Sequence, residues 1–302
     1  MLSIIICTYN RDKYIYNALK SIAENSFPFE NYEIVLVNNN STDNTENECK
    51  RFQNDFPQVN FNYFNEDQQG LSFARNRGIK ESQGDFLVFL DDDSFVGKDY
   101  LNNLSDNLEK YPDCEAFGGK IIPKFENGET PKWLSKWTYS WVSAIDMGDN
   151  IREFKGNKYP IGANMGIRKA VLNNIGHFNT KLGRSKKNLM AGEEKDIFNR
   201  IKNLDKKIYY FPNINVQHVI PSQRTTDDYI VRMGRGIGMS EKLRTINISK
   251  TSYFKRLFSE LIKWGGALVL FVGFCFRFQP QKGTKLLLFR WNVTKGLLTK
   301  IE

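Results

Sequence analysis

The sequence predicts an α/β fold in which mostly parallel strands alternate with helices. Short apolar runs of strand length, rich in β-branched and aromatic residues, recur along roughly residues 1–220, and helix-like patterns separate them. Polar loops follow the first, second and fourth of these runs. Ligands of parallel α/β sheets bind outside the carboxyl ends of the strands, so the three polar loops together predict a binding site at that edge.

The expected elements follow from these runs. Strands are predicted at residues 2–7, 32–37, 59–64, 86–90 and 208–211. Helices are predicted from about Lys13, after Asp43, after Gly70 and after Glu194. The run 86–90 is apolar without interruption, which is typical of a strand that is buried on both faces.

Composition and charge limit the classes of function. The chain has 302 residues and a net charge of +9. Residues 223–302 hold 15 Lys and Arg against 5 Asp and Glu, so this segment carries +10 and the other 222 residues carry −1. Such a split argues against a general nucleic-acid binder and favours a local anionic partner such as a membrane surface. Four cysteines without metal-ligand spacing indicate reduced thiols in a cytosolic protein, and the N-terminus has no basic region that would predict a signal peptide.

Three consecutive carboxylates, Asp91, Asp92 and Asp93, follow the strand 86–90 directly. Like charges this close repel, so a cation is expected beside them, and oxygen ligands suit Mg²⁺ or Mn²⁺. Such a cation can also hold a diphosphate. The alternative is an acidic turn in which Asp93 or Ser94 caps the next helix.

Five motifs follow one another along the chain: Thr8-Tyr9-Asn10-Arg11, Asn39-x-Ser41-x-Asp43, Gly70-Leu71-Ser72-x-Ala74-Arg75-Asn76-x-Gly78, Asp91-Asp92-Asp93 and Gly192-Glu193-Glu194. In this order they resemble the motifs of family 2 glycosyltransferases, with Asp91-Asp92-Asp93 at the place of the DXD motif, and the resemblance covers roughly residues 1–220. The resemblance implies a GT-A (Rossmann-like) fold, a nucleotide-sugar donor, a divalent metal (Mg or Mn) and inversion at the anomeric carbon.

The resemblance also implies roles for single residues. Donor-binding residues would be Thr8, Tyr9, Arg11, Asn38, Asn39, Asp43, Gly70, Arg75, Asp91 and Asp92. Among them, Thr8, Tyr9 and the loop 38–43 would hold the base and ribose, and Arg75 would approach the base or diphosphate. Asp93 would ligate the metal, and His218 would complete the coordination. The alternative is that His218, as a lone histidine, has a structural role. The family usually has Asp at the position of Asn38. The Asn38 amide oxygen can still accept a hydrogen bond from the base, but it lacks the negative charge that strengthens such a bond. The alternative for residues 38–40 is a plain turn without a role in donor binding.

The acidic pair is the candidate catalytic centre. By the resemblance, Glu194 would deprotonate the acceptor hydroxyl, and Glu193 would help to place the acceptor. Arg200, one turn further, could pair with either glutamate. The alternative is that both glutamates only stabilise the N-terminus of the helix that they begin.

The second half of the chain is less regular. The predicted domains are 1–222, a GT-A domain with a nucleotide-sugar half (1–120) and an acceptor half (121–222), and 223–302, a helical membrane-associating region. Trp133, Trp137 and Trp141 have a four-residue spacing, which predicts one face of a helix that either packs on the core or forms an acceptor platform. Segment 160–167 resembles the family strand that faces the acceptor, and segment 182–188 is polar and basic.

The C-terminal region is predicted to be helical, basic and apolar, with joints at Gly234, Gly236 and Gly238. Its run 264–276 is apolar for 13 residues. As a helix this run would measure about 20 Å, short of the ~30 Å of a bilayer core, so an interfacial or re-entrant segment is expected. Residues 285–300 form a second amphipathic candidate; the alternative is a docking helix buried on the domain or in a dimer.

The sequence thus predicts an inverting glycosyltransferase that moves a sugar from a nucleotide-diphosphate sugar to a hydroxyl of a glycan acceptor. The basic tail favours a lipid-linked glycan at the cytoplasmic face of the cell membrane, in cell-surface polysaccharide synthesis. One alternative is a nucleotidyltransferase, which is disfavoured because the loop 8–11 has no glycine. The other alternative is a non-catalytic scaffold that binds sugar nucleotides. Only the acidic pair Glu193 and Glu194 argues against a scaffold.

Overall fold

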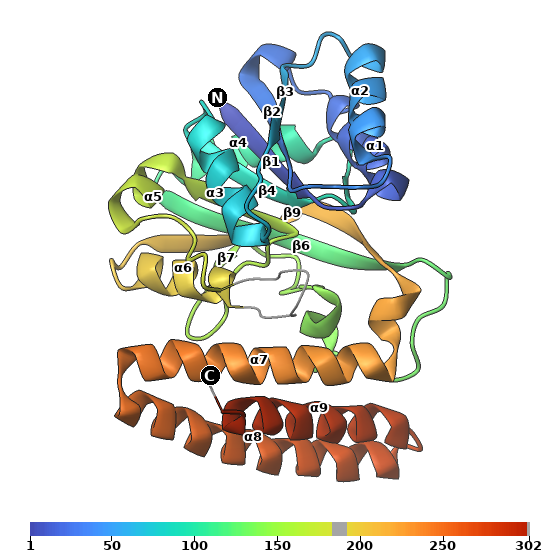
Figure 1. Ribbon diagram of the computed structural model, residues 1–302, viewed down its shortest axis with the longest axis vertical. Helices are drawn as coiled ribbons and strands as arrows, with labels where there is room; N and C mark the ends of the chain where they lie inside the picture. The colour runs from blue at the N-terminus through green and yellow to red at the C-terminus, as the bar shows by residue number, and fades with distance from the viewer. Residues whose placement is uncertain (183–191, 301–302) are drawn as a thin grey trace. The chain divides into compact units, whose positions relative to one another are not determined.

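A computed structural model of the chain describes residues 1–182 and 192–300 (Figure 1). Their contacts form two compact units. The first comprises residues 1–124, 143–181 and 193–219, and the second comprises, of the described residues, 125–142, 182, 192 and 220–300. The predicted boundary at residue 222 stays a prediction, because these units divide the chain at several points. Most of the polar and basic segment 182–188 lies outside the described residues.

One mixed sheet runs through the first unit. Its strands are β1 (Leu2–Thr8), β2 (Tyr32–Asn38), β3 (Phe61–Asn65), β4 (Phe86–Asp91), β5 (Ser94–Val96), β6 (Cys114–Phe125), β7 (Arg152–Glu153), β8 (Asn164–Arg168) and β9 (Lys207–Ile220). The order is β3-β2-β1-β4-β8-β6-β9-β5, and β7 also pairs with β9. The strands β1 to β4 pair in parallel, as predicted, whereas β8 is antiparallel to β4 and β6. β9 is far longer than the predicted strand 208–211.

Helices cover both faces of this sheet. They are α1 (Asp12–Ala23), α2 (Thr45–Asp55), α3 (Leu71–Glu81), α4 (Tyr100–Lys110), α5 (Lys169–Ile175) and α6 (Glu193–Lys202), with a short 3₁₀ helix η1 (Phe29–Asn31). Successive strand side chains point to opposite faces, which gives two apolar cores. Ile4 and Ile6 of β1 pack with residues of α1, α2 and α4, whereas Ile5 packs with residues of α3, α5 and α6. The predicted α/β fold is confirmed.

Three long helices dominate the second unit and lie side by side (Figure 1). They are α7 (Asp227–Ile248), α8 (Lys250–Phe276) and α9 (Pro280–Leu298), preceded by 3₁₀ helices η2 (Tyr139–Val142) and η3 (Ser222–Thr225). Side chains of Thr226 and Ser249 accept hydrogen bonds from backbone N–H groups at the starts of α7 and α8. The apolar face of α9 is buried, so the predicted segment 285–300 is a packed helix.

The predicted tryptophan helix is wrong. Only the short η2 forms in this segment, and its tryptophans do not share one environment. Trp133 and Trp141 are buried with ring centroids 5.8 Å apart, and Trp141 stacks on Phe289 of α9 at 4.4 Å. Trp137 is 50% exposed. Packing of two rings inside the unit, rather than helical periodicity, therefore decides the conformation.

The predicted short apolar helix 264–276 is also corrected. α8 begins at Lys250 and has 27 residues, which makes it about 40 Å long at ~1.5 Å per residue. Among the described residues, α8 is the one helix that is long and apolar enough to cross a membrane by these two measures, with a mean hydropathy of 1.6 over 18 residues. Length and composition alone are weak evidence for crossing.

The glycines predicted as joints lie within a continuous helix, α7, and serve close packing instead. A Cβ built on Gly238 would come within 2.2 Å of the Val293 carbonyl oxygen, and one on Gly296 within 2.2 Å of the Arg235 carbonyl oxygen. The backbones of α7 and α9 can approach this closely only because both positions lack a side chain.

This packing predicts the effect of adding one methyl group. Gly238→Ala should lower the melting temperature of the protein, because the new Cβ meets backbone atoms that cannot move aside. Gly265→Ala is the matched control, since a Cβ there meets nothing within 4 Å; in a helix it should be neutral or stabilising by up to ~1 kcal/mol. Equal melting temperatures for the two variants would contradict the close-packing account.

Candidate functional site

The candidate site lies at the carboxyl ends of the parallel strands. The register places Cys7 of β1 beside Asp91 of β4, and Thr8 beside Asn38 of β2. The segments that follow these strands carry most of the predicted site residues. The first compact unit contains all of them: Thr8, Tyr9, Arg11, Asn38, Asn39, Asp43, Gly70, Arg75, Asp91, Asp92, Asp93, Glu193, Glu194 and His218.

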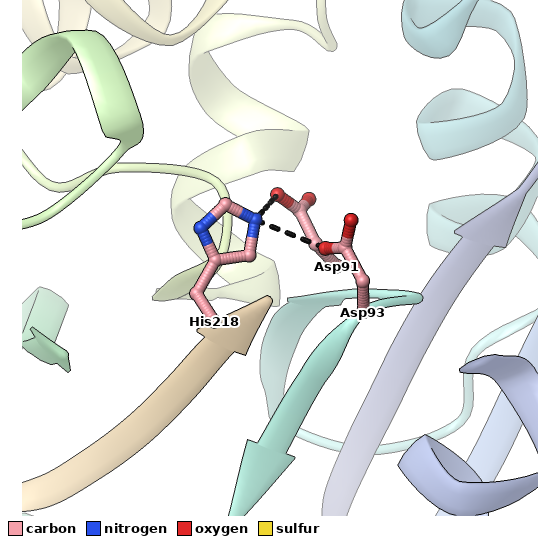
Figure 2. A group of neighbouring side chains, drawn as sticks. All are labelled: Asp91, Asp93 and His218. Atoms are coloured by element: carbon pink, nitrogen blue, oxygen red, sulfur yellow. Dashed lines mark ion pairs between the residues drawn. The ribbon is translucent and has the colours of Figure 1, made fainter. Parts of the chain in front are cut away.

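Asp91, Asp93 and His218 form a cluster that could hold a metal ion. One ligand atom of each lies within 4.8 Å of the others. Nε2 of His218 is 2.9 Å from Oδ1 of Asp93 and 3.7 Å from Oδ2 of Asp91. Figure 2 shows this nitrogen directed toward both carboxylates. Asp93 and His218 are buried, whereas the Asp91 side chain is 34% exposed.

Strand pairing brings residues 93 and 218 together, although they are far apart in sequence. β5 pairs antiparallel with β9, with Ser94 opposite His218. The backbone N–H of Val219 also donates to the carbonyl oxygen of Asp93 at 2.9 Å. The long β9, which the sequence predicted only in part, is therefore what carries the histidine to the acidic cluster.

Arg11 pairs with two of the three consecutive carboxylates. Its Nε is 3.3 Å from Asp92, and a terminal nitrogen is 3.8 Å from Asp93. Burial raises the pKa of the Asp92 carboxyl to about 7, and the positive charge of Arg11 opposes that rise. Burial alone would lower the pKa of Arg11, but the charges of Asp92 and Asp93 raise it above its ordinary value. A cation thus already belongs to this cluster of carboxylates, as like-charge repulsion requires.

The loop after β2 is held by its own polar side chains. Asn39 is buried; its amide nitrogen donates to the carbonyl oxygens of Glu66 and Gln68, both at 2.8 Å, and its oxygen accepts from the N–H of Gly70 at 2.7 Å. Gly70 has a φ of 147°, a region that favours glycine, at the start of α3. The side chain of Asn39 therefore joins two loops to a helix start.

Asn38 and Asp43 are also bound within this region. The Asn38 amide donates to the Tyr63 hydroxyl at 2.7 Å, and its oxygen accepts from the N–H of Ser41 at 3.0 Å. Asp43 accepts from the N–H groups of Asp12 and Thr45, both at 3.1 Å. Burial opposes ionisation of Asp43, but these hydrogen bonds and that of the Thr45 hydroxyl hold its pKa below the ordinary value. These contacts agree with the turn that the sequence offered as an alternative for residues 38–40. The donor-binding roles of Asn38, Asn39 and Asp43 stay predictions.

A buried arginine holds the acidic pair. The guanidinium of Arg75, on α3, is 3.2 Å from Oε1 of Glu193 and 3.1 Å from Oε1 of Glu194 at the start of α6. The N–H of Gly162 also donates to Oε1 of Glu194, at 2.9 Å. Burial would lower the pKa of Arg75, but Glu194, Glu193 and Asp91 together raise it. In this structure the guanidinium of Arg75 contacts the glutamates, and its donor-binding role stays a prediction.

The two glutamates differ in exposure. The Glu193 side chain is 5% exposed and that of Glu194 is 21% exposed, so Glu194 is the more accessible to an acceptor. Gly162 lies so close that a Cβ there would come within 2.1 Å of Arg75 and 2.2 Å of Glu194. Arg200, which the sequence offered as a partner of the glutamates, pairs with Asp196 at 3.0 Å and donates to the carbonyl of His177 at 2.8 Å.

Two contributors to this site were not predicted. The Phe178 ring lies under the Arg75 guanidinium, 5.2 Å from its centroid. The Asn76 side chain exchanges two hydrogen bonds of 2.9 Å with the backbone of Phe178. Asn76 was part of the motif that carries the resemblance, and its two-way bond explains why an amide suits that position. Phe178 gives no signal in the sequence.

The cluster of Asp91, Asp93 and His218 fits the divalent cation that the fold family implies. Carboxylate oxygens suit Mg²⁺ and Mn²⁺, and imidazole nitrogen suits transition metals. The imidazole nitrogen that faces both carboxylates is Nε2 of His218, and this side chain is completely buried. Two carboxylate oxygens and one imidazole nitrogen that lie this close together could therefore hold a divalent cation.

The comparisons with known proteins agree with this arrangement. The family model described as glycosyl transferase family 2 matches residues 3–176, more than half of the chain. The chain belongs to glycosyl transferase family 2. It is a glycosyltransferase, which confirms the enzyme class predicted from the sequence and sets aside the nucleotidyltransferase alternative.

Two curated relatives of this glycosyltransferase are archaeal. It is 25% identical over 269 residues to the glucosyl-dolichyl phosphate glucuronosyltransferase of Haloferax volcanii, covering 85% of this chain and 82% of that protein. It is 34% identical over 133 residues to the dolichyl N-acetyl-alpha-D-glucosaminyl phosphate 3-beta-D-2,3-diacetamido-2,3-dideoxy-beta-D-glucuronosyltransferase of Methanococcus voltae. That second match covers 42% of this chain and only 40% of the relative.

A solved structure shares the fold along nearly the whole chain. The mannosyltransferase PcManGT from Pyrobaculum calidifontis, in complex with GDP-Man and Mn²⁺, superposes with a TM-score of 0.67 at 16% identity. The match covers 98% of this chain and 87% of that one. At this identity the likeness shows the fold alone, and the GT-A fold predicted from the sequence is confirmed.

The group of Asp91, Asp93 and His218 leads to a prediction about Mn²⁺ binding in variants of the protein. Asp93→Ala should weaken Mn²⁺ binding at least tenfold, because the variant loses a buried carboxylate of the cluster. His218→Ala should weaken it as well. Asp106→Ala, which removes an exposed carboxylate from α4, is the matched control. Titration of free Mn²⁺ by electron paramagnetic resonance measures the affinities, and unchanged affinity in both cluster variants would exclude this cluster as the metal site.

Proposed function

We propose that this glycosyltransferase transfers one sugar, with inversion, from a nucleotide-diphosphate sugar to a hydroxyl of a lipid-linked glycan. The observation that carries the proposal is the pairing of two arrangements within one compact unit: the cluster of Asp91, Asp93 and His218, and the pair Glu193 and Glu194 held by Arg75. A metal-ligand set suits a diphosphate leaving group, and an ordered, accessible carboxylate suits a general base.

Glu194 is the proposed base. The acceptor oxygen attacks the anomeric carbon from the face opposite the leaving group while Glu194 takes the proton of the hydroxyl, so no covalent intermediate forms. When bound, a divalent cation neutralises negative charge on the departing nucleotide diphosphate. Arg75 and the N–H of Gly162 fix one oxygen of Glu194, which makes Arg75 a positioning residue in this proposal.

The two glutamates have different roles in this proposal. Buried Glu193 forms the inner half of the pair with Arg75, whereas partly exposed Glu194 is presented to the acceptor. A carboxylate in a partly buried position is well suited to proton abstraction, because it is held in place and remains accessible to its substrate. The remaining donor roles proposed for Thr8, Tyr9, Arg11, Asp91 and Asp92 agree with their place at the carboxyl ends of β1 and β4.

The acceptor class rests on the relatives and on the charge of the C-terminal region. Both archaeal relatives carry dolichyl phosphate in their names, and a dolichyl-linked sugar is a membrane-bound acceptor. Residues 223–302 carry +10, which suits an anionic membrane surface. We therefore place the reaction at the cytoplasmic face of the cell membrane, in the synthesis of a cell-surface glycan.

The acid–base assignment predicts a large loss of transfer in Glu194→Gln. General-base catalysis contributes about 10²–10⁴-fold, and this variant keeps the shape of the side chain but cannot accept the proton. Its affinity for the donor should stay within about twofold of the wild type, a threshold that we set as the limit for unchanged binding. Turnover of a panel of UDP- and GDP-sugars with a membrane extract as acceptor, and donor binding by calorimetry, are the two measurements.

Glu193→Gln is the matched control, because it neutralises the neighbouring and more buried carboxylate. It should reduce turnover less than Glu194→Gln does. A loss below about tenfold in Glu194→Gln would remove Glu194 as the base. Donor binding without turnover in the wild-type protein, over the whole panel, would favour a non-catalytic scaffold instead.

A further inference from the structure

The outer face of α8 is apolar along nearly its full length. Its large side chains follow a helical spacing from residue 254 to residue 276, and each is at least half exposed. They are Phe254, Phe258, Leu261, Ile262, Leu268, Val269, Val272 and Phe276. Only 11% of the most apolar 18-residue stretch of this helix is buried. An exposed apolar face of this length indicates a binding partner.

The exposed charges of α8, a helix that the structure describes completely, are all positive. Lys250, Lys255 and Lys263 are exposed, and exposed Arg277 follows the helix. The only acidic residue in α8, Glu260, is buried, with Arg256 at 2.8 Å and Arg290 of α9 at 3.1 Å. The surface of this helix therefore combines an apolar face with cations, which complements an anionic lipid surface.

The inner face of α8 is fixed to α9 from end to end. Close to the start of α8, the Tyr253 hydroxyl donates to the carbonyl of Leu297 at 2.8 Å. Farther along, the Trp264 indole donates to the Thr294 hydroxyl at 3.0 Å. Toward its end, Phe271 lies against Gly283, where a Cβ would come within 2.6 Å. The two helices thus run antiparallel as one layer.

α9 is bound in the same way to α7 along its length. Asp227 at the start of α7 pairs with Lys285, Gly238 in its middle lies against Val293, and Lys242 donates to the carbonyl of Thr299 at 2.7 Å. α7 is strongly charged. Its ionisable side chains include Asp227, Asp228, Arg232, Arg235, Glu241, Lys242 and Arg244.

We propose that α8 lies in the plane of an anionic lipid surface, with its apolar face inserted among the acyl chains and its lysines at the headgroups. The proposal deepens the membrane contact proposed above and rests on it for the biological setting. α8 does not cross the bilayer. If it did, α9 and the charged helix α7 would be drawn to the same depth, where charged side chains are costly.

A second copy of the chain is a poorer occupant for this face. Pairing two copies of α8 would bring the exposed lysines of both toward one another without an exposed carboxylate on either helix to offset them. An anionic lipid surface satisfies both the apolar face and the cations. Self-association is therefore an outcome that the test must distinguish.

A depth profile along α8 tests the proposal. Single spin labels are placed at residues 254, 258, 261, 265, 269, 272 and 276 of the full chain, with the exposed Cys275 changed to Ser, and bound to vesicles of phosphatidylcholine and phosphatidylglycerol. Accessibility to oxygen and to a water-soluble nickel chelate gives the depth of each label. A helix in the plane predicts one shallow depth, ~5–10 Å, at every position.

Each other pattern overturns the proposal. Depth that rises toward residue 265 and falls beyond it shows a helix that crosses the bilayer. Labels that stay accessible to water, together with dipolar broadening between labels on different molecules, show that a second copy covers the face. A label at exposed Arg232 of α7 is the control and should remain in water.

Charge substitution gives an independent measurement. Leu261→Asp, at a position 68% exposed, should reduce vesicle binding at least tenfold in flotation without lowering the melting temperature, because an exposed side chain does not support the fold. Leu204→Asp, at an exposed leucine of the first unit, is the matched control and should leave binding unchanged. Equal binding by both variants would overturn the proposal. Donor hydrolysis measured without vesicles separates a failure of this inference from a failure of the proposed catalytic function.

Discussion

The buried charge of Arg75 is the constraint on which the arrangement of the acidic pair depends. Its side chain is 3% exposed, and an arginine removed from water in this way requires partners. Removal of one partner from a buried ion pair costs about 3–5 kcal/mol, so the protein is held to a geometry in which both glutamates remain on the guanidinium. Because Arg75 belongs to α3 and the glutamates begin α6, one interaction fixes the start of α6 against a helix that lies 118 residues earlier. Gly162 and Phe178 complete the enclosure.

Residues far apart in sequence also meet in the candidate metal site of Asp91, Asp93 and His218. Asp91 ends β4, Asp93 precedes β5, and His218 lies opposite Ser94 on β9, so the pairing of β5 with β9 brings the three side chains together. Asp91 also contributes to the raised pKa of Arg75, which shows that the two clusters interact electrostatically. In the proposed reaction, a donor whose diphosphate binds beside Asp91, Asp93 and His218 and an acceptor bound beside Glu194 would meet at the carboxyl edge of the parallel strands, where ligands of such sheets bind.

The parts of the fold that the sequence predicts well are those with local causes. β1, β2 and β4 are mostly apolar runs, and the loops after them contain the polar residues that define the site. The parts that it predicts poorly depend on distant partners. α8 extends to Lys250 because Arg256 and Glu260, which precede the apolar run 264–276, find partners on α7 and α9. Gly234 and Gly238 look like joints in the sequence but are places where two helix backbones touch. The partner of Arg75 could not be predicted, because no local pattern connects residue 75 with residues 193 and 194.

The most direct test of this account is the pH–rate profile of Arg75→Gln, compared with Arg77→Gln on the same helix, whose arginine pairs with Glu81 near the surface. If Arg75 holds the acidic pair, its loss removes a positive charge from Glu194, so the carboxylate binds a proton more readily. The acid limb of the profile should then move to higher pH and kcat should fall, with the KM for the donor nearly unchanged, while Arg77→Gln behaves like the wild type. An increased donor KM with an unmoved acid limb would contradict the account and return Arg75 to the donor site.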